Sequence, residues 1–234
     1  MTDQEFEVAK RSALDLCDEI NASTHFFDAL SAYPYAPSLF FSHFNVKAMP
    51  NSVDFANGAT RYVFWDPDDC TYVIKVQFAD RESFNYGAQE CAVYEEAKRR
   101  GIDKYFTFTR LAFTYKDIEV YIADFIDVDE DHNINLVYDY WFEKWCADLN
   151  YQPTDDNYEE WQNSDNYDPE YFETQDGILD YIYDKINCRD ARAIIDLITD
   201  SDINDIHIGN FGWRDETIIF TDYAGYERKL AIVK

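Results

Sequence analysis

Hydrophobic residues recur at helical spacing over the first twenty positions of the chain. Thr2 and Glu5 stand where a capping box would begin such a helix, because each side chain can accept the backbone N–H of the other residue. We therefore predict a helix that ends near 21–23 and is followed by an aromatic-rich connection over 26–41. The apolar face of the helix consists of Phe6, Ala9, Ala13, Leu16 or Cys17, and Ile20.

Runs of β-branched and aromatic residues then predict two β-hairpins with a helix between them. Turn-forming residues at 66–69 join the first two strands, and Lys116-Asp117 joins the second two. The helix covers about 85–100, carries three basic residues in its last turn and is stopped by Gly101. The predicted strands are 61–65, 71–78, 106–115 and 119–126.

The composition changes in the second half of the chain. Residues 127–184 hold 18 acidic residues and 13 aromatic residues but a single basic one, Lys144. The centre of this segment, 151–170, contains turn-forming residues with little periodicity, so we expect loops or short helical turns there. Further helices are predicted over 176–186 and 189–197, and β-like patterns return over 206–212 and 217–221.

Charge excludes several classes of partner. The 234 residues include 47 acidic and 20 basic ones, a formal charge of −27, while 47% apolar content is ample for a packed core. A phosphate backbone or an anionic membrane surface would be repelled, so we expect no direct binding to nucleic acid or membrane. The acidic start of the chain and the absence of a long apolar run predict a cytoplasmic protein. The five cysteines, which show no metal-ligand spacing, are expected to be buried free thiols.

A motif near the C-terminus carries the most specific chemical signal. Asp205-Ile-His-Ile-Gly-Asn210 precedes a short strand, and Asp222-Tyr-Ala-Gly225 follows it. This resembles the catalytic loop and the following metal-binding Asp of the protein kinase-like fold, in the version found in aminoglycoside and other small-molecule kinases. Phosphoryl transfer needs a carboxylate that orients the attacking hydroxyl and oxygen ligands that hold magnesium. The resemblance implies that Asp205 is the catalytic base, that Asn210 and Asp222 bind the metal, and that His207 and Gly209 shape the loop.

A second set of residues occurs upstream, in the order that the kinase-like fold requires. Lys75, in Tyr72-Val-Ile-Lys75-Val, is similar to the phosphate-binding Lys of the third kinase strand, and Glu90 to its helical partner. The resemblance further implies that Gly58 lies in the turn covering the phosphates and that Ile126 and Val128 form the hinge that binds adenine. Taken alone, a strand Lys and a helical Glu are more often solvated.

The resemblance implies an α+β, bilobal fold that binds ATP and Mg²⁺. We expect an N-terminal helical extension (1–50), a kinase-like N-lobe (51–126) and a shortened C-lobe with an acidic aromatic insertion (127–234). The sequence departs from the kinase pattern at two points that affect the expected activity. Asn204 precedes the expected base where small-molecule kinases usually have Gly, and only nine residues follow Gly225. The acceptor would then be held by the extension, the insertion or a partner.

The sequence therefore leaves two candidate functions. The first is a kinase-like phosphotransferase, or a pseudokinase that only binds nucleotide. The second is an acidic, phage-type inhibitor that imitates DNA and occupies a basic nucleic-acid-binding host protein through residues 139–176, as anti-restriction and anti-CRISPR proteins do; a phage-encoded protein would act in the host cytoplasm. In that segment the acidic residues Glu159, Glu160, Asp165, Asp168, Glu170 and Glu173 alternate with the aromatic residues Tyr158, Trp161, Tyr167, Tyr171 and Phe172. The ordinary structural interpretation is a solvated face over an aromatic core.

Overall fold

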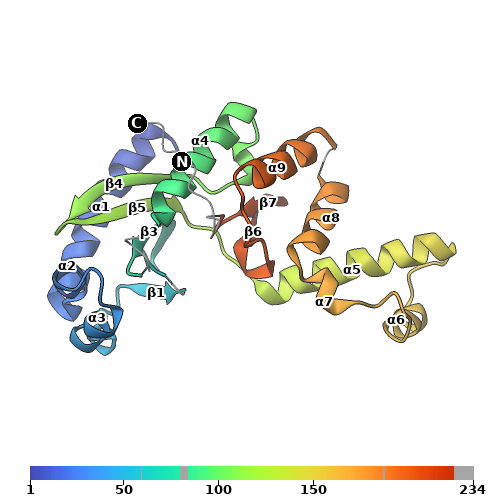
Figure 1. Cartoon of the computed structure of the whole chain (residues 1–234), viewed down its shortest axis with the longest axis horizontal. Coiled ribbons are helices and arrows are strands. Elements are labelled where there is room, and N and C mark those ends of the chain that lie inside the picture. Colours follow the sequence, from blue (N-terminus) through green and yellow to red (C-terminus); the bar gives the residue numbers. More distant parts are fainter. Residues whose placement is uncertain (59, 80–83, 187, 224–234) are drawn as a thin grey trace. The chain divides into compact units, whose positions relative to one another are not determined.

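The computed structural model describes residues 1–58, 60–79, 84–186 and 188–223 of the chain. Over these ranges the protein is α+β, with nine α-helices, a five-stranded antiparallel sheet and a separate two-stranded hairpin (Figure 1). Contacts divide it into two compact units. Of the described residues, the first unit comprises Met1–Glu95 and Thr107–Phe125, and the second comprises Glu96–Phe106 and residues 126–223.

Three helices begin the first unit. Helix α1 (Asp3–Thr24) starts with the predicted capping box, in which Thr2 N–H donates to Glu5 Oε2 (2.6 Å) and Glu5 N–H donates to Thr2 Oγ1 (3.3 Å). It ends at His25, whose φ of 59° is left-handed. The expected connection instead forms helices α2 (Phe26–Ala32) and α3 (Pro37–His43), because its aromatic side chains pack into the core.

The sheet of the first unit contains both predicted hairpins and one strand that was not predicted. Its order is β1-β2-β3-β5-β4, with every neighbouring pair antiparallel. Lys116 and Asp117, both with positive φ, form the tight turn between the last two strands, as expected. The strands are β1 (Asp54–Asn57), β2 (Arg61–Asp66), β3 (Asp69–Gln77), β4 (Thr109–Tyr115) and β5 (Ile118–Asp124).

The two faces of this sheet have different partners. On one face, side chains such as Phe64 and Ile74 join a single core cluster with Phe26 and Leu30 of the N-terminal helices. The other face is approached by helix α4 (Tyr86–Arg100), which ends at Gly101 (φ 74°) as predicted. A Cβ on Gly87 would lie 2.4 Å from the Tyr121 ring, so only glycine permits this close packing of helix on strand.

The second unit is mostly helical. The predicted helices are present as α8 (Gln175–Lys185) and α9 (Cys188–Asp200), and the expected short helical turns are α6 (Asp155–Gln162) and α7 (Pro169–Phe172). A 20-residue helix, α5 (Glu130–Leu149), was not predicted. Among the described residues, no helix is long and apolar enough to cross a membrane.

A short hairpin completes the second unit. Strands β6 (Phe211–Arg214) and β7 (Thr217–Phe220) are joined by Asp215 and Glu216, both with positive φ. The strand expected from 206 begins only at Phe211, because residues Ile208–Asn210 form a 3₁₀ turn capped by the His207 side chain.

The cysteine thiols were expected to be buried, and two of those described are not fully so. Of the cysteines whose side chains are described, Cys17 and Cys146 are buried and Cys91 is half-buried, but Cys70 is exposed. It lies beside the turn of the first hairpin, where its Sγ is 3.4 Å from the Pro67 carbonyl oxygen. Burial raises the pKa of the Cys91 thiol to about 12.

Candidate functional site

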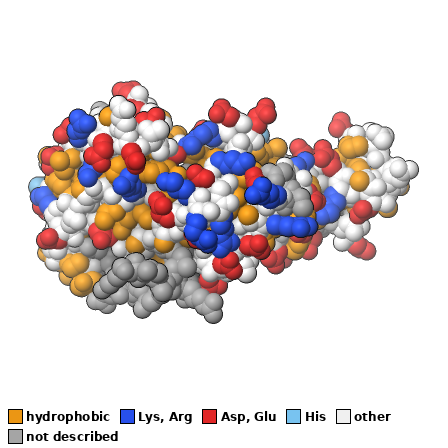
Figure 2. Space-filling model, turned by 90° about the horizontal axis from the view of Figure 1, so that it is seen from above, with side chains coloured by type: hydrophobic (Ala, Val, Ile, Leu, Met, Phe, Trp, Pro, Cys, Tyr) orange, Lys and Arg blue, Asp and Glu red, His pale blue; other side chains and the backbone are white. Residues whose placement is uncertain are grey.

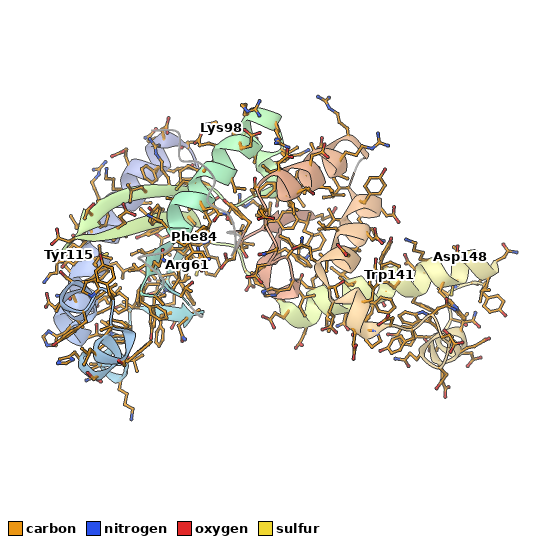
Figure 3. The ribbon with its side chains drawn as sticks, in the orientation of Figure 1. Arg61, Phe84, Lys98, Tyr115, Trp141 and Asp148 are labelled. Atoms are coloured by element: carbon orange, nitrogen blue, oxygen red, sulfur yellow. The ribbon has the colours of Figure 1, made fainter. Side chains whose placement is uncertain are left out.

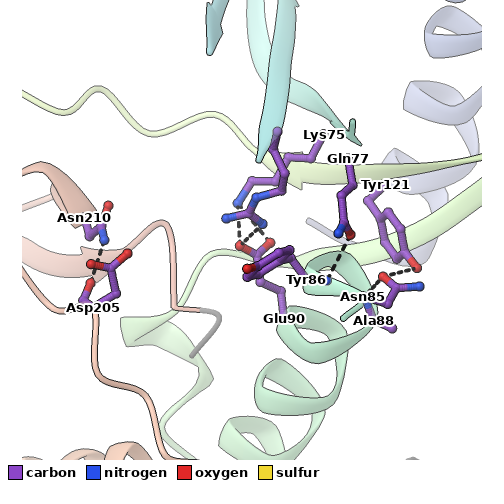
Figure 4. Close-up of polar contacts among 10 residues, drawn as sticks. Lys75, Gln77, Asn85, Tyr86, Ala88, Glu90, Tyr121, Asp205 and Asn210 are labelled. Carbon is purple, nitrogen blue, oxygen red and sulfur yellow. Dashed lines mark hydrogen bonds and ion pairs between the residues drawn. The ribbon is translucent and has the colours of Figure 1, made fainter. Parts of the chain in front are cut away.

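Lys75 and Glu90 form a buried ion pair within the first unit (Figure 4). The Lys75 Nζ lies 3.1 and 3.0 Å from the two carboxylate oxygens of Glu90. Glu90 is fully buried and Lys75 is 7% exposed. Burying a carboxylate costs several kcal/mol unless it is paired and hydrogen-bonded, so neither residue is the solvated side chain of the ordinary interpretation.

Arg61 is a third member of this cluster, and the sequence interpretation did not include it. Its Nη1 donates to Glu90 Oε1 at 2.6 Å, the same oxygen that accepts from Lys75. Its guanidinium also lies over the Tyr86 ring, 5.5 Å from the centroid (Figure 3 shows Arg61). Glu90 thus holds two cations from neighbouring strands.

Gly58 lies in the turn between β1 and β2. Its N–H donates to the Arg61 carbonyl oxygen (3.0 Å), and a Cβ at this position would meet nothing within 4 Å. The conformation therefore makes no demand for glycine, although the turn leads directly to Arg61.

The C-terminal motif is assembled within the second unit. Asn210 Nδ2 donates to the Asp205 carbonyl oxygen at 2.6 Å (Figure 4), and Thr221 N–H donates to the Asn210 carbonyl oxygen at 2.9 Å. The second bond continues the hairpin ladder, in which Phe211 is opposite Phe220. The hairpin therefore brings Asp222, the residue after Thr221, back toward Asn210.

His207 and Gly209 shape the loop between Asp205 and Asn210. The Gly209 N–H donates to His207 Nδ1 (3.1 Å), which leaves the proton of a neutral imidazole on Nε2. That nitrogen lies 3.8 Å from Asp205 Oδ1. A Cβ on Gly209 would lie 2.7 Å from Glu130 Oε1 and 3.0 Å from the His207 ring, so the turn has little room for a side chain.

Two side-chain amides that the sequence interpretation missed, one buried and one half-buried, hold this loop. Asn133 of α5, fully buried, donates from Nδ2 to the carbonyl oxygens of Ile208 and Phe211, both at 2.7 Å. Its Oδ1 accepts from the Trp213 indole N–H at 2.9 Å. Gln175 of α8 donates to the Ile203 carbonyl oxygen (3.1 Å) and accepts the N–H of Ile206 (3.3 Å). The loop is thus fixed on both sides by side chains that carry no charge.

The expected hinge residues, Ile126 and Val128, lie in an extended segment between β5 and α5, and both are half-buried. A Cβ on Gly212 would lie 2.3 Å from the Asp127 carbonyl oxygen and 2.5 Å from Ile126 Cγ2. Strand β6 therefore packs directly on the backbone of this segment, and glycine is required at that point.

The two expected metal ligands, Asn210 and Asp222, have oxygen atoms of the kinds that magnesium prefers. An Asn amide oxygen and a carboxylate, with waters and phosphate oxygens, make up a typical Mg²⁺ sphere. Asn210 is 7% exposed and Asp222 is half-buried. No cluster of three or more His, Cys, Asp or Glu residues suited to a metal occurs in the described part of the chain.

The acidic segment arranges its aromatic residues as a core. Trp161 and Phe172 are 1% and 3% exposed and stack on each other at 5.7 Å, and Phe172 also stacks on Trp141 of α5 (Figure 3). The six acidic residues named above for this segment are exposed, as is Tyr171. On the face shown in Figure 2, acidic and basic side chains lie interspersed.

Comparison with known proteins gives this chain no relative: no protein-family model, no curated protein and no solved structure matches it.

Proposed function

We propose that this chain is a kinase-like protein that binds ATP with Mg²⁺ and acts as a phosphotransferase. Lys75, held by Glu90, contacts the nucleotide phosphates, while Asn210 and Asp222 bind the magnesium ion. Asp205 orients the acceptor hydroxyl and takes its proton as the phosphorus–oxygen bond forms. Gly58 covers the phosphates, and the backbone at Ile126 and Val128 binds the adenine.

The observation that carries the proposal is the buried pair of Lys75 and Glu90. The resemblance predicted a strand lysine and the glutamate of the next helix as partners, and their atoms lie 3.0 Å apart with the carboxylate fully buried. Three strands, a helix and two more strands follow each other along the chain in the order that places a phosphate-binding lysine on the third strand.

The C-terminal motif supports the proposal independently. Asp205 and Asn210 are joined by a 2.6 Å hydrogen bond, and the hairpin returns the chain to Asn210 just before Asp222. A base and two metal ligands contributed by one loop–hairpin segment are what phosphoryl transfer needs, because positioning and charge neutralisation supply most of its catalysis.

A thermal-shift titration with ATP, with and without Mg²⁺, tests the proposal. A ligand at 100 times its dissociation constant stabilises the folded state by about 2.7 kcal/mol, which gives a measurable rise in Tm. We expect Lys75→Met to weaken the response to ATP, and Asp222→Asn to abolish only the part that depends on Mg²⁺. Matched controls are Lys98→Met, on the exposed side of α4 (Figure 3), and Asp196→Asn, exposed on α9. Wild-type protein that shows no Mg²⁺-dependent shift, or variants that respond like their controls, would reject the nucleotide site.

The exposed carboxylates in and around α6 and α7 favour a second candidate function, binding to a basic protein. In the described residues no ion pair involves Glu159, Glu160, Asp165, Asp168, Glu170 or Glu173, so their charge is available to a partner. Converting these six residues to Gln or Asn should abolish salt-sensitive binding to a basic DNA-binding protein, measured in competition with duplex DNA. Equal binding by the neutralised variant would eliminate this function without affecting the first.

A further inference from the structure

A cavity of about 180 Å³ lies in the second unit, between α8 and the turn end of the β6–β7 hairpin. Asp205 and Asn210 precede β6 and Asp222 follows β7, so these residues are at the opposite end of the hairpin. None of the proposed nucleotide or metal ligands lines the cavity. It is therefore separate from the site described above.

Aromatic rings form much of the cavity wall. Tyr105, Tyr181 and Trp213 line it, together with aliphatic side chains from α8 and β7. Tyr105 is held in place by its hydroxyl, which donates to Asp190 Oδ2 at 2.9 Å. Such walls favour a flat, apolar ring, because aromatic pairs add to the hydrophobic gain of burial.

Tyr181 gives the cavity its polar group. The residue is 3% exposed, and its hydroxyl makes no hydrogen bond to another described residue. Burial raises the pKa of this hydroxyl to about 12, so it remains a donor at neutral pH. Among the described residues the one fully buried side-chain polar atom without a partner is Trp141 Nε1, so the Tyr181 hydroxyl is open to the cavity, and a ligand atom there can replace water as its acceptor.

Trp213 connects the cavity to the loop that carries Asp205. Its ring lines the cavity, while its Nε1 donates to Asn133 Oδ1 at 2.9 Å. The same Asn133 side chain donates to the carbonyl oxygens of Ile208 and Phe211. A shift of the indole ring therefore changes the position of the amide that holds the loop.

We propose that this cavity binds a small, single-ring aromatic molecule with a polar substituent, and that its occupancy is transmitted to loop 205–210 through Trp213 and Asn133. Size supports one ring, since a cavity of about 150 Å³ accepts benzene. The substituent hydrogen-bonds the Tyr181 hydroxyl, and Lys185, Glu216 and Thr217 surround the cavity with further polar groups.

The test uses phenol as the probe and the ¹⁵N-labelled whole chain without nucleotide, so that its result does not depend on the proposed ATP site. Phenol should shift the Trp213 indole N–H signal, assigned with Trp213→Phe, and the Gly209 amide signal with one saturating curve. Cyclohexanol, which has the hydroxyl but no aromatic ring, should bind at least tenfold more weakly. Tyr181→Phe should weaken phenol binding about 2- to 10-fold, the range expected for one net hydrogen bond.

Tyr183→Phe is the matched control, because Tyr183 is on the same helix but does not line the cavity. It should bind phenol like the wild type. Absence of a saturable shift at Trp213, equal binding of cyclohexanol, or an unchanged affinity in Tyr181→Phe would overturn the binding site. Saturable binding at Trp213 with an unshifted Gly209 amide would overturn its link to the loop.

Discussion

Replacing Glu90 by glutamine tests the charge balance on which the candidate site depends. The substitution keeps the shape of the side chain and removes a negative charge that both Arg61 and Lys75 contact. The two cationic nitrogens lie 2.6 and 3.1 Å from the same oxygen, so they cannot be farther apart than the sum of these distances, about 5.7 Å. Without the carboxylate they repel each other in a buried place.

The distance between the two cationic nitrogens sets the size of the expected loss of stability. Two unit charges about 5.7 Å apart repel by about 3 kcal/mol at an effective dielectric constant of about 20. Removal of one partner from a buried ion pair costs about 3–5 kcal/mol, so we expect Glu90→Gln to lower the free energy of unfolding of the first unit by that amount. Lys75→Met should cost less, about 1.5–3 kcal/mol, because Glu90 still accepts from Arg61.

The double variant, Glu90→Gln with Lys75→Met, tests directly whether the two cations share the carboxylate. In Glu90→Gln, removing Lys75 relieves the repulsion, so Lys75→Met should cause no further loss of stability in that background. If the two substitutions acted independently, their losses of unfolding free energy would instead add. A non-additivity of at least 1.5 kcal/mol is therefore the expected signature of a carboxylate shared by two cations.

Urea unfolding of protein labelled with 5-fluorotryptophan can follow each unit separately. Trp65 is the single tryptophan of the first unit, while Trp141, Trp145, Trp161 and Trp213 belong to the second. Glu95→Gln, an exposed change on the same helix, is the control. The electrostatic reasoning is refuted if Glu90→Gln stays within 1 kcal/mol of that control, or if the two substitutions add.

Three further predictions concern other parts of the molecule. Gly212→Ala should destabilise the second unit by about 2 kcal/mol or more in urea unfolding, because its Cβ would lie 2.3 Å from the Asp127 carbonyl oxygen; a neutral effect would contradict this packing. Hydrogen bonds from two arginines in its own helix lower the pKa of Glu96 to about 2. The stabilisation by this ionised group is complete above about pH 4.5 and is lost as the pH falls toward 2, so Glu96→Gln should reduce stability at pH 7 by at most about 1 kcal/mol and have no effect near pH 2. Finally, iodoacetamide should label the exposed Cys70 within minutes and Cys91 far more slowly in the native protein, as peptide mass spectrometry would show; equal rates would contradict the burial of Cys91.

Local signals were sufficient to predict much of the fold. The capping box at Thr2, the stop at Gly101 and the turn at Lys116-Asp117 each depend on residues adjacent in sequence, and each is present in the structure. Helix α5 was not predicted because its apolar residues do not form one stripe at helical spacing. Aromatic residues occur on several sides of it, since Tyr140 and Trp145 are buried while Trp141 contacts α7, so no single apolar stripe marks the helix.

The role of Arg61 could not be predicted, because it depends on a β-bulge. The turn pairs Asp66 with Asp69, and an uninterrupted ladder from this pair would place Arg61 and Lys75 on opposite faces of the sheet. A register shift between Phe64 and Asp66 instead places Val63 opposite Lys75. Arg61 then shares a face with Lys75, and both reach Glu90. Between these two pairs β3 advances three residues more than β2, an odd number that exchanges the faces and leaves no mark in the hydrophobic pattern here.

The hairpin within the C-terminal motif was easier to predict, because its geometry follows from a count of residues. A two-residue turn and two four-residue strands make Phe211 face Phe220, which sets Thr221 beside Asn210 and lets Asp222 follow immediately. Adding or removing one residue in either strand would turn every side chain after it to the other face. The number of residues between Asn210 and Asp222 therefore fixes how these two positions meet at the open end of the hairpin. The amides of Asn133 and Gln175, which fix the loop from distant helices, have no such spacing and could be found only in the folded chain.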